Sequence, residues 1–268
     1  ARRVDLPTYA WQRQRYWVNV PGALRQVGEA TGHGLLGSRV PAAGFTAVFE
    51  SEIGLESHPW LGDHRVTGQV LMPGAALAEI LRAAAVQAGR VTPQVEGLVL
   101  QAPLLLAESG LQRVQVVLDE SPEDGLTASV YSQPSSRAAD AGWTLHATAR
   151  IGKDWASAPQ GLDRVAIQGR CSGSIDVGAL YERLAEGGLA YGPAFQGLRS
   201  LQQGNGECLG EVSLPEGLET KGYGVHPALL DAAFHALAGA GSGWSTGERY
   251  LPFEIGRYAV YQEEAESA

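Results

Sequence analysis

The chain has 268 residues, 44% of them hydrophobic, and carries a formal net charge of −9 at pH 7. This length predicts one large globular domain or two smaller units that share a core. The dispersed basic residues argue against nucleic acid as a partner, and the lack of an apolar run of about 20 residues argues against a membrane span.

Cysteine and histidine usage bounds the chemistry further. The two cysteines, Cys171 and Cys208, form no Cys-x-x-Cys pair, and the six histidines are scattered along the chain. We therefore expect free thiols and no metal centre. Because no secretory leader opens the chain, we also expect a reducing, cytoplasmic location.

The first twenty residues differ in composition from the rest of the chain. Residues 6–17 are dense in aromatic side chains and arginine. We predict that residues 1–20 form a strap that packs its aromatic rings onto a neighbouring surface. A basic recognition arm is the alternative.

Short alternating runs follow, broken by Gly and Pro, as is typical of antiparallel strands. The strand candidates in this part of the chain are 46–50, 97–100, 114–118, 127–131 and 143–151. One apolar, Ala-rich helix is predicted over 75–88, ending before Gly89. A buried helix wrapped by an antiparallel sheet is the hot-dog arrangement, an α+β fold.

The same pattern recurs after a predicted linker at 157–161. Helices are predicted at 176–186 and 227–238, and strands at 208–214 and 258–261. Both halves place a Pro-containing turn directly before an apolar helix. This repetition indicates two hot-dog units side by side.

His64 is the first candidate for catalysis. An imidazole takes up a proton near neutral pH without help from a metal, so His64 is a candidate general base. Gly68, four residues later, is expected to permit close approach of the backbone. For His64 taken alone, a structural role beside the turn is the alternative. His58 is a second choice of base, although its position before Pro59 favours a role in shaping the turn.

Pro73 and Gly74 mark the start of the predicted central helix. Backbone N–H groups at a helix start lack intrahelical partners and lie at the positive end of the helix dipole. A substrate carbonyl placed against the Gly74 N–H would be polarised, which favours removal of a proton from the adjacent carbon.

Asp231 is the second catalytic candidate, because it is an acid within an apolar helix. Burial raises the pKa of a carboxyl group, so Asp231 is expected to stay protonated and to act as a general acid. His235, at i+4, lies one turn further on and can orient it. Tyr191 stands beside a Gly-Pro turn and offers a hydroxyl to a departing oxygen, with aromatic packing as the alternative.

Four short motifs stand in a fixed order along the chain. His64 to Pro73 fits His-x-x-x-Gly-x-x-x-x-Pro, Tyr191 to Phe195 fits Tyr-Gly-Pro-x-Phe, Asp231 to His235 fits Asp-x-x-x-Gln/His, and Leu251 to Phe253 is Leu-Pro-Phe. In these motifs the chain resembles the dehydratase domains of modular polyketide synthases. The opening segment at 6–17 resembles the linker that follows an acyltransferase domain, so the resemblance covers nearly the whole chain.

The resemblance implies a double hot-dog fold. A first unit at 21–160 would carry His64, and a second unit at 161–268 would carry Asp231. It also implies pairing of two chains through their N-terminal halves as a homodimer. Further strands would follow Leu-Pro-Phe, so the second unit is expected to be incomplete at its C-terminal end.

The resemblance also implies a hydro-lyase reaction, the loss of water from a 3-hydroxyacyl chain to give the 2-enoyl thioester. The chain would be held on the phosphopantetheine arm of an acyl carrier protein, beside neighbouring synthase domains and without a diffusible cofactor. By position, His64 takes the α-proton, Asp231 protonates the β-hydroxyl, and the Gly74 N–H contacts the thioester oxygen. Tyr191 and His235 support the hydroxyl side. The residues expected to line the pocket are Leu189, Ala190, Pro193, Phe195, Leu230 and Phe234.

Leu189 departs from the resembled pattern, which often has Tyr at the second position of Gly-Tyr-x-Tyr-Gly-Pro. An altered substrate preference is therefore expected. Three alternatives stay open: ring closure by a distal substrate hydroxyl after dehydration, movement of the double bond in the same pocket, and a non-catalytic double hot-dog module that organises its neighbours.

Overall fold

The computed structural model describes residues 28–135, 142–154, 161–240, 251–263 and 265–267. The predicted strap at 1–20 and nearly all of the predicted linker at 157–161 lie outside these residues, so both stay predictions. None of the helices in the described part of the chain combines the length and apolar character that a bilayer-spanning helix needs.

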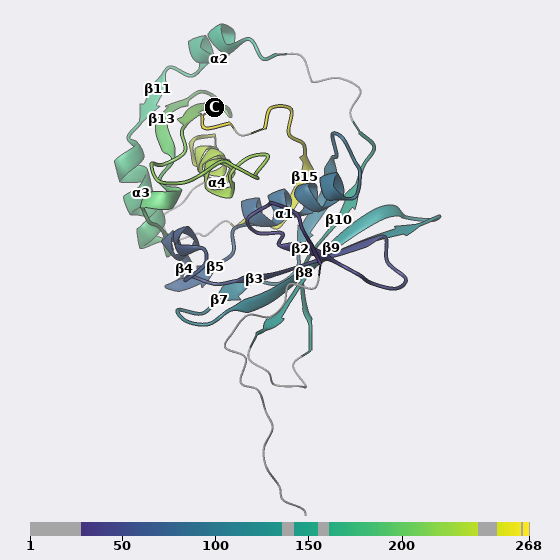
Figure 1. The fold of residues 1–268 in the computed structure, drawn as a ribbon. Helices are drawn as coiled ribbons and strands as arrows, with labels where there is room; N and C mark the ends of the chain where they lie inside the picture. Colours follow the sequence, from purple (N-terminus) through teal and green to yellow (C-terminus); the bar gives the residue numbers. More distant parts are fainter. Residues whose placement is uncertain (1–27, 136–141, 155–160, 241–250, 264, 268) are drawn as a thin grey trace, which may run out of the picture.

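A large antiparallel sheet wraps around helix α1 (Gly74–Gln87), as Figure 1 shows. Its strand order is β1-β2-β3-β8-β9-β10-β6-β15. The bounds are β1 Glu29–Ala30, β2 Ser38–Val40, β3 Ala47–Ile53, β6 Val95–Leu100, β8 Gln112–Ser121, β9 Gly125–Pro134, β10 Thr144–Ile151 and β15 Glu254–Tyr258. All five strands predicted in the first half are confirmed as β3, β6, β8, β9 and β10.

The alternation of apolar residues explains how this sheet and helix meet. Strand β9 buries every second side chain from Leu126 to Ser132, and β8 does the same from Val114 to Leu118. Every residue of α1 from Ala75 to Ala85 is buried. The hot-dog arrangement predicted for the first half is thus confirmed, because a half-buried sheet needs an apolar element to cover its inner face.

Two smaller sheets complete the described fold. One has the order β12-β4-β5-β7, with β4 at His64–Val66, β5 at Gln69–Leu71, β7 at Leu105–Leu106 and β12 at Leu189–Tyr191. The other has the order β11-β13-β14, with β11 at Gly173–Ile175, β13 at Leu198–Gln203 and β14 at Cys208–Val212. The remaining elements are η1 Pro59–Asp63, α2 Arg164–Arg170, α3 Val177–Glu186, η2 Pro193–Phe195, α4 Pro227–His235 and η3 Ala236–Gly239.

Two predicted elements of the second half need correction. The helix predicted over 227–238 is α-helical to His235 and continues as the 3-10 turn η3. The strand predicted at 258–261 lies earlier, as β15, which ends at Tyr258. Tyr258 pairs with Val95, the first residue of β6, so beyond it the neighbouring strand offers no partner. Helix α2 and strands β11, β12 and β13 were not predicted.

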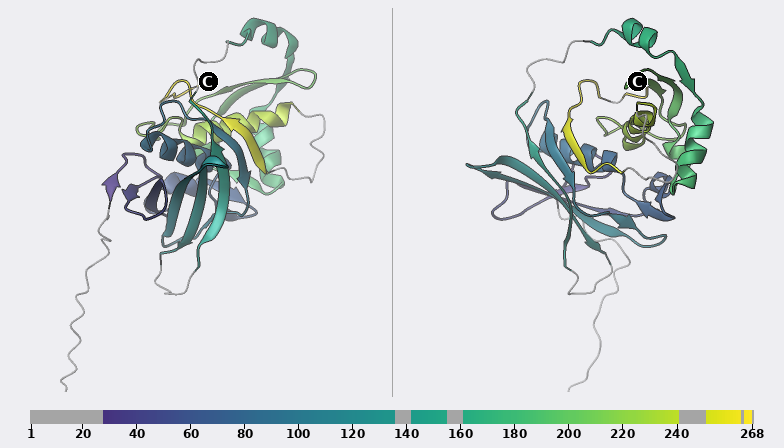
Figure 2. Two further views of the ribbon diagram at one scale, coloured as in Figure 1. Left: turned by 90° about the vertical axis from the view of Figure 1, so that its right-hand side faces the viewer. Right: turned by 180° about the vertical axis from the view of Figure 1, so that it is seen from behind.

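Strands of the second half join sheets of the first. Strand β12 pairs with β4, and β15 pairs with β6. Helices α1 and α4 also pack against one another, as the views of Figure 2 show. The two predicted units therefore share sheets, and their boundary at residue 160 stays a prediction.

Glu79 on α1 is the centre of a buried polar network that joins distant segments. Its carboxylate accepts two hydrogen bonds from Arg82, each at 2.9 Å, one from the Gly224 N–H at 2.6 Å and one from the Tyr258 hydroxyl at 2.9 Å. Arg82 also contacts Glu263 at 3.1 Å. The network ties α1 to the loop before α4 and to the last strand, because none of these groups can be buried without its partners.

We expect protonation of Glu79 to destabilise the fold. Burial raises the pKa of Glu79, but its contacts with His33, Arg82 and Gly224 outweigh burial and lower the pKa to about 2. A depressed folded pKa stabilises the protein above the unfolded value, near 4.5, and this contribution is lost as the pH falls toward 2. The loss amounts to about 3 kcal/mol.

Urea denaturation at pH 7, 4 and 3 measures this effect. Glu79→Gln should lower stability at pH 7 by about 3–5 kcal/mol, because Arg82 loses its buried counter-charge, and should weaken the dependence on acid. Glu108→Gln is the matched control: its carboxylate pairs with Arg65 but is 71% exposed, so little change is expected. Equal acid dependence in the wild type and Glu79→Gln would contradict the assignment.

Candidate active site

His64 is the first residue of β4 and is buried, with 6% of its surface exposed. Its Nδ1 lies 2.8 Å from the carbonyl oxygen of Leu71 on the adjacent strand β5. A carbonyl can only accept, so Nδ1 carries the proton, and the Nε2 of the neutral ring is free to take one up. That Nε2 lies 3.9 Å from Oδ2 of Asp231.

Asp231 lies on helix α4, and the capped start of this helix fixes its position. His226 caps this helix through its side chain, which accepts from the Ala228 N–H at 3.1 Å, and Pro227 occupies the first turn. Asp231 is 7% exposed, and its Oδ2 lies 3.0 Å from Nε2 of His235, one turn further along. The structure thus brings together an imidazole of the first half and a carboxyl group of the second.

The protonation of Asp231 differs from the sequence-based expectation. Burial raises the pKa of Asp231, as predicted, but the hydrogen bond with His235 and the nearby imidazole of His64 outweigh burial and lower it below its ordinary value. The prediction that burial alone keeps this carboxyl group protonated is wrong. Sequence reasoning treated His235 as an orienting group and did not weigh its hydrogen bond to Asp231 against the effect of burial.

Tyr191 on β12 lies directly opposite His64 on β4. The centre of its ring is 5.5 Å from that of His64 and 4.1 Å from that of His235. Burial, together with the negative charge of Asp231, raises the pKa of the Tyr191 hydroxyl. The Tyr191 hydroxyl is therefore neutral and able to donate a hydrogen bond, and its ring lies close to both histidines.

The Tyr-Gly-Pro motif is anchored to the segment that precedes His64. Asp63 accepts a hydrogen bond from the Ala194 N–H at 2.8 Å, and a side chain at Gly192 would collide with the Asp63 carboxylate. Phe195, which ends this turn, is fully buried with its ring centre 5.1 Å from that of His64. Glycine is required at position 192 because the turn packs so closely on η1.

Three supporting residues lie where the chain turns. Pro73 caps α1, and Gly74 is its first residue, where a Cβ atom would approach Leu100 to 3.1 Å. Gly68 corrects an expectation: it is exposed at the tip of the β4–β5 hairpin, with φ of 81°, and a Cβ atom added there would meet nothing within 4 Å. Glycine is favoured at position 68 because the turn requires a positive φ, and not because another backbone segment approaches closely.

The expected pocket residues do not all face the site. Side chains alternate along a strand, so Ala190, which pairs with Arg65, faces the side of the sheet away from Tyr191 and His64. Its assignment to the pocket is therefore corrected. Pro193 is exposed at the start of η2, which places it outside the buried part of the site.

The other four expected pocket residues are partly or fully buried, Phe195 completely so. Leu189 belongs to the hydrophobic core of the second half, where it packs with Leu180 and Leu184. Leu230 and Phe234 are half-buried on α4, on either side of Asp231. Their contact with a substrate stays a prediction.

Sequence reasoning missed Tyr181 on α3. Its hydroxyl lies 3.2 Å from Nδ1 of His235, and burial raises its pKa to about 12. A tyrosine on the apolar face of an amphipathic helix, beside Leu180 and Leu184, is a weak signal for a buried hydroxyl that needs a partner.

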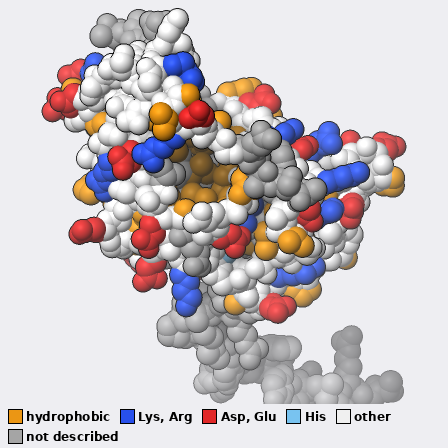
Figure 3. All heavy atoms as spheres, turned by 90° about the horizontal axis from the view of Figure 1, so that it is seen from above, with side chains coloured by type: hydrophobic (Ala, Val, Ile, Leu, Met, Phe, Trp, Pro, Cys, Tyr) orange, Lys and Arg blue, Asp and Glu red, His pale blue; other side chains and the backbone are white. Residues whose placement is uncertain are grey.

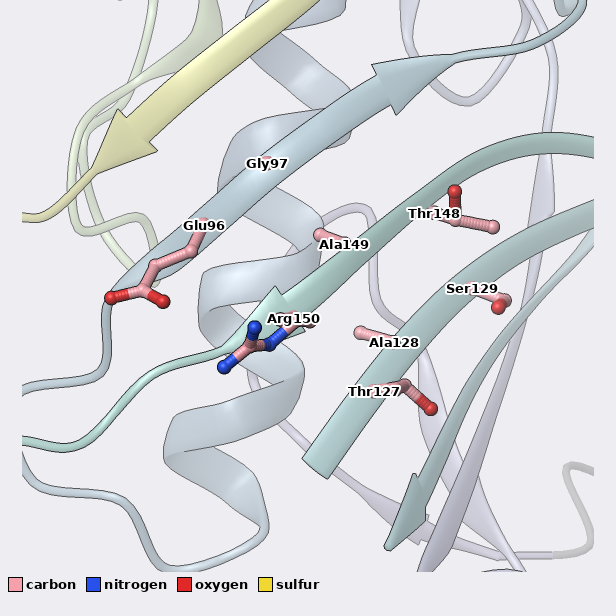
Figure 4. Close-up of a pocket in the computed structure, with 8 residues that line it drawn as sticks. All are labelled: Glu96, Gly97, Thr127, Ala128, Ser129, Thr148, Ala149 and Arg150. Atoms are coloured by element: carbon pink, nitrogen blue, oxygen red, sulfur yellow. The ribbon is translucent and has the colours of Figure 1, made fainter. Parts of the chain in front are cut away.

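The surface of the described residues is hollowed in places. Figure 3 shows a hollow with hydrophobic side chains near the middle of one face. A separate hollow of about 470 Å³ lies on β6, β9 and β10 (Figure 4). Its lining residues are Glu96, Gly97, Thr127, Ala128, Ser129, Thr148, Ala149 and Arg150. No predicted site residue lines that second hollow.

Both cysteines lie in the described part of the chain. Cys171 is a buried free thiol and Cys208 a half-buried one, as predicted. Within the described ranges, no group of three or more His, Cys, Asp or Glu side chains is placed to hold a metal ion.

Comparison with known proteins identifies the family. Residues 33–133 match the family of the polyketide synthase dehydratase domain, and residues 159–268 match the family described as polyketide synthase dehydratase N-terminal domain. Polyketide synthase GfsA of Streptomyces halstedii is 38% identical over 99% of this chain, which spans 4% of the length of GfsA.

Solved structures agree. The dehydratase domain of the CurK module of the curacin polyketide synthase has a TM-score of 0.78 and 30% identity, over 88% of this chain and 84% of that one. It has also been solved as inactive mutants, one with His replaced by Phe and one with Asp replaced by Asn. The dehydratase domain from the terminal module of the rifamycin polyketide synthase has a TM-score of 0.78 and 30% identity, over 90% and 86%.

This chain belongs to the polyketide synthase dehydratase domains. It has their double hot-dog fold and is a hydro-lyase that acts on a 3-hydroxyacyl intermediate of polyketide biosynthesis.

Proposed function

We propose that His64 and Asp231 carry out the dehydration as general base and general acid. The observation that carries this proposal is the 3.9 Å distance between Nε2 of His64 and Oδ2 of Asp231 in a buried site. Groups in these two roles must reach opposite ends of one short segment of substrate, the α-carbon and the β-hydroxyl.

The proposed reaction proceeds with a balanced transfer of protons. Nε2 of His64 takes the proton from the α-carbon, and the electron pair of that C–H bond forms the double bond between the α- and β-carbons. The bond from the β-carbon to the hydroxyl oxygen breaks while a proton from Asp231 reaches that oxygen, so water and a 2-enoyl thioester result. One proton passed from His64 to Asp231 restores the starting state.

The remaining site residues are proposed to stabilise charge. The first N–H groups of α1, at Gly74, would bind the thioester oxygen as negative charge develops on it. The neutral hydroxyl of Tyr191 would hold the β-oxygen as it leaves. The reaction then needs no diffusible cofactor, because the thioester itself acidifies the α-proton.

The substrate is proposed to arrive on the phosphopantetheine arm of an acyl carrier protein. Support comes from relatives such as GfsA, which are polyketide synthases far longer than this chain. Neighbouring synthase domains are the other proposed partners, together with a second copy of the chain as a homodimer.

Incubation of the domain with 3-hydroxyacyl pantetheine thioesters tests this function. The expected product has lost the mass of one water and shows the absorbance of a conjugated enoyl thioester. The same substrate loaded on an acyl carrier protein serves as a second arm. Unchanged substrate in both arms with folded protein would contradict the proposal.

Tyr191→Phe is expected to lower kcat about 10-fold with little change in KM. The variant loses one hydrogen bond that strengthens as the oxygen departs, worth about 1.4 kcal/mol. Steady-state kinetics on the pantetheine thioester measure the effect. Tyr131→Phe, on β9 of the large sheet, is the matched control and should keep its kcat; equal kcat in the two variants would argue against a role for Tyr191.

A further inference from the structure

The Tyr181 hydroxyl has three hydrogen-bond partners. It donates to the Phe195 carbonyl at 3.3 Å, accepts from the Leu198 N–H at 3.3 Å and lies 3.2 Å from Nδ1 of His235. Helix α3 holds it in place: Asp176 caps this helix through the Ala179 N–H at 2.9 Å, and its apolar face packs into the core of the second half.

These contacts determine which nitrogen of His235 carries a proton. A hydroxyl has one hydrogen and two lone pairs. The hydrogen points to the Phe195 carbonyl, which can only accept, and the Leu198 N–H takes one lone pair. The second lone pair faces Nδ1 of His235, so Nδ1 must be the donor in this contact. Rotation of the hydroxyl toward His235 would leave the carbonyl of the buried Phe195 without its donor, which is unfavourable.

A proton on Nδ1 has a consequence for the contact with Asp231. Neutral His235 then presents an unprotonated Nε2 to Oδ2 of Asp231 at 3.0 Å. Two lone pairs at this distance repel each other, so the contact requires a proton between the two atoms. That proton belongs to the pair: it lies on Nε2 beside a carboxylate or on Oδ2 beside a neutral imidazole.

We propose that Tyr181 is a positioning residue that holds His235 in the tautomer with Nδ1 protonated, so that His235 and Asp231 together store the proton for the leaving hydroxyl. This inference rests on the proposed function. It explains how a carboxyl group whose pKa is lowered by its neighbours still acts as the acid. During the reaction the stored proton passes from the pair to the β-oxygen, and no further reactant is needed.

The same geometry favours the return of the proton. Once the pair has given up its proton, the unprotonated Nε2 faces a carboxylate, and this repulsion is relieved when the proton taken up by His64 comes back to Asp231. His64 is the nearest source, since its Nε2 lies 3.9 Å from the same Oδ2.

Several titratable groups surround the pair. His64 faces it from β4, Tyr191 from β12 and Tyr181 from α3. The charge of Arg199 on β13 lowers the pKa of Tyr181, although burial of the hydroxyl outweighs this effect. The thiol of Cys208 on β14 donates a hydrogen bond to the Ala236 carbonyl, next to His235. The two tyrosines stay neutral because burial raises their pKa values, and His64 is present in every variant compared below.

The test is the pH dependence of kcat for the wild type, Tyr181→Phe, His235→Gln and the double variant. Phenylalanine offers Nδ1 no acceptor, so the proton moves to Nε2, and the pair loses its stored proton more readily. We expect the alkaline limb of the Tyr181→Phe profile to move to lower pH by about one unit, with KM unchanged. In the His235→Gln background, where the imidazole is absent, Tyr181→Phe should add no further shift.

A matched control separates positioning from packing. Tyr258→Phe on β15 also removes a buried hydroxyl, which donates to Glu79, and should lower the melting temperature without moving the alkaline limb. A Tyr181→Phe profile that coincides with the wild-type profile would overturn the proposal. So would an equal effect of Tyr181→Phe with and without His235.

Nitrogen-15 NMR of labelled histidines gives a readout independent of turnover. The His235 signal, assigned by its loss in His235→Gln, should report a protonated Nδ1 in the wild type and a shift of the neutral ring to protonated Nε2 in Tyr181→Phe. Protonation of Nε2 but not Nδ1 in the wild type overturns the proposal, even where Tyr181→Phe does not fold. A wild type that does not dehydrate the thioester contradicts the proposed function, whereas active wild type with an unaltered Tyr181→Phe contradicts only the role of Tyr181.

Discussion

Replacing His64 by Phe is expected to lower kcat for dehydration by about 10³-fold or more. General base catalysis contributes roughly 10²–10⁴-fold, and in this site Nε2 of His64 is the nitrogen that is both unprotonated and directed at Asp231. Phenylalanine keeps the ring that packs on Phe195 and Tyr191, so the fold should survive. The loss of the hydrogen bond to the Leu71 carbonyl costs about 1 kcal/mol of stability.

His58 supplies the control for this experiment, since the sequence left it as a second choice of base. Its Nδ1 lies 2.9 Å from the Ser57 hydroxyl and its Nε2 lies 3.0 Å from the Gly34 carbonyl, so both nitrogens are occupied. Burial also lowers the pKa of His58. His58→Gln should therefore keep most of kcat. Product formation from the pantetheine thioester, with melting curves for folding, measures both variants; full activity in His64→Phe would show that the base is assigned wrongly.

Replacing Asp231 by Asn is expected to lower kcat by about 10²–10³-fold with a small change in KM. The amide has the shape of the carboxyl group but cannot release a proton to the β-oxygen, and it cannot balance charge on His64 or His235. Because the variant is isosteric, contacts that align the substrate are retained. The effect should therefore fall on the chemical step, which single-turnover kinetics separate from binding.

Asp176→Asn is the matched control for Asp231→Asn. Asp176 caps α3 through the Ala179 N–H, and Asn caps a helix equally well. This variant should keep both the melting temperature and kcat of the wild type. Equal kcat in Asp231→Asn and Asp176→Asn would remove Asp231 from the reaction.

Local sequence patterns were sufficient for the elements whose burial is periodic. Strands β8 and β9 alternate, and α1 is rich in Ala on several sides, so each could be predicted without knowledge of its neighbours. Short elements escaped prediction for the opposite reason. Strands such as β4 and β12 have three residues each, too few to show a period, and their pairing with each other is a contact between distant parts of the chain.

The residues of the candidate site were likewise predicted from the sequence only in part. Motif spacing predicted His64, Tyr191, Asp231 and His235 as a group, and the structure brings them together. Spacing along the chain misplaced Ala190, because the face of a strand that a residue occupies depends on register with the partner strand. It also missed Tyr181, because no short motif links that residue to His235.

Sequence alone determined which chemical groups this domain possesses and in what order they occur, since residue type and periodicity are local properties. The tertiary structure decided their protonation and their partners. The lowered pKa of Asp231 and the proposed tautomer of His235 arise from groups on several different elements that meet in a buried site, where hydrogen-bond partners, and not residue type, determine where a proton resides.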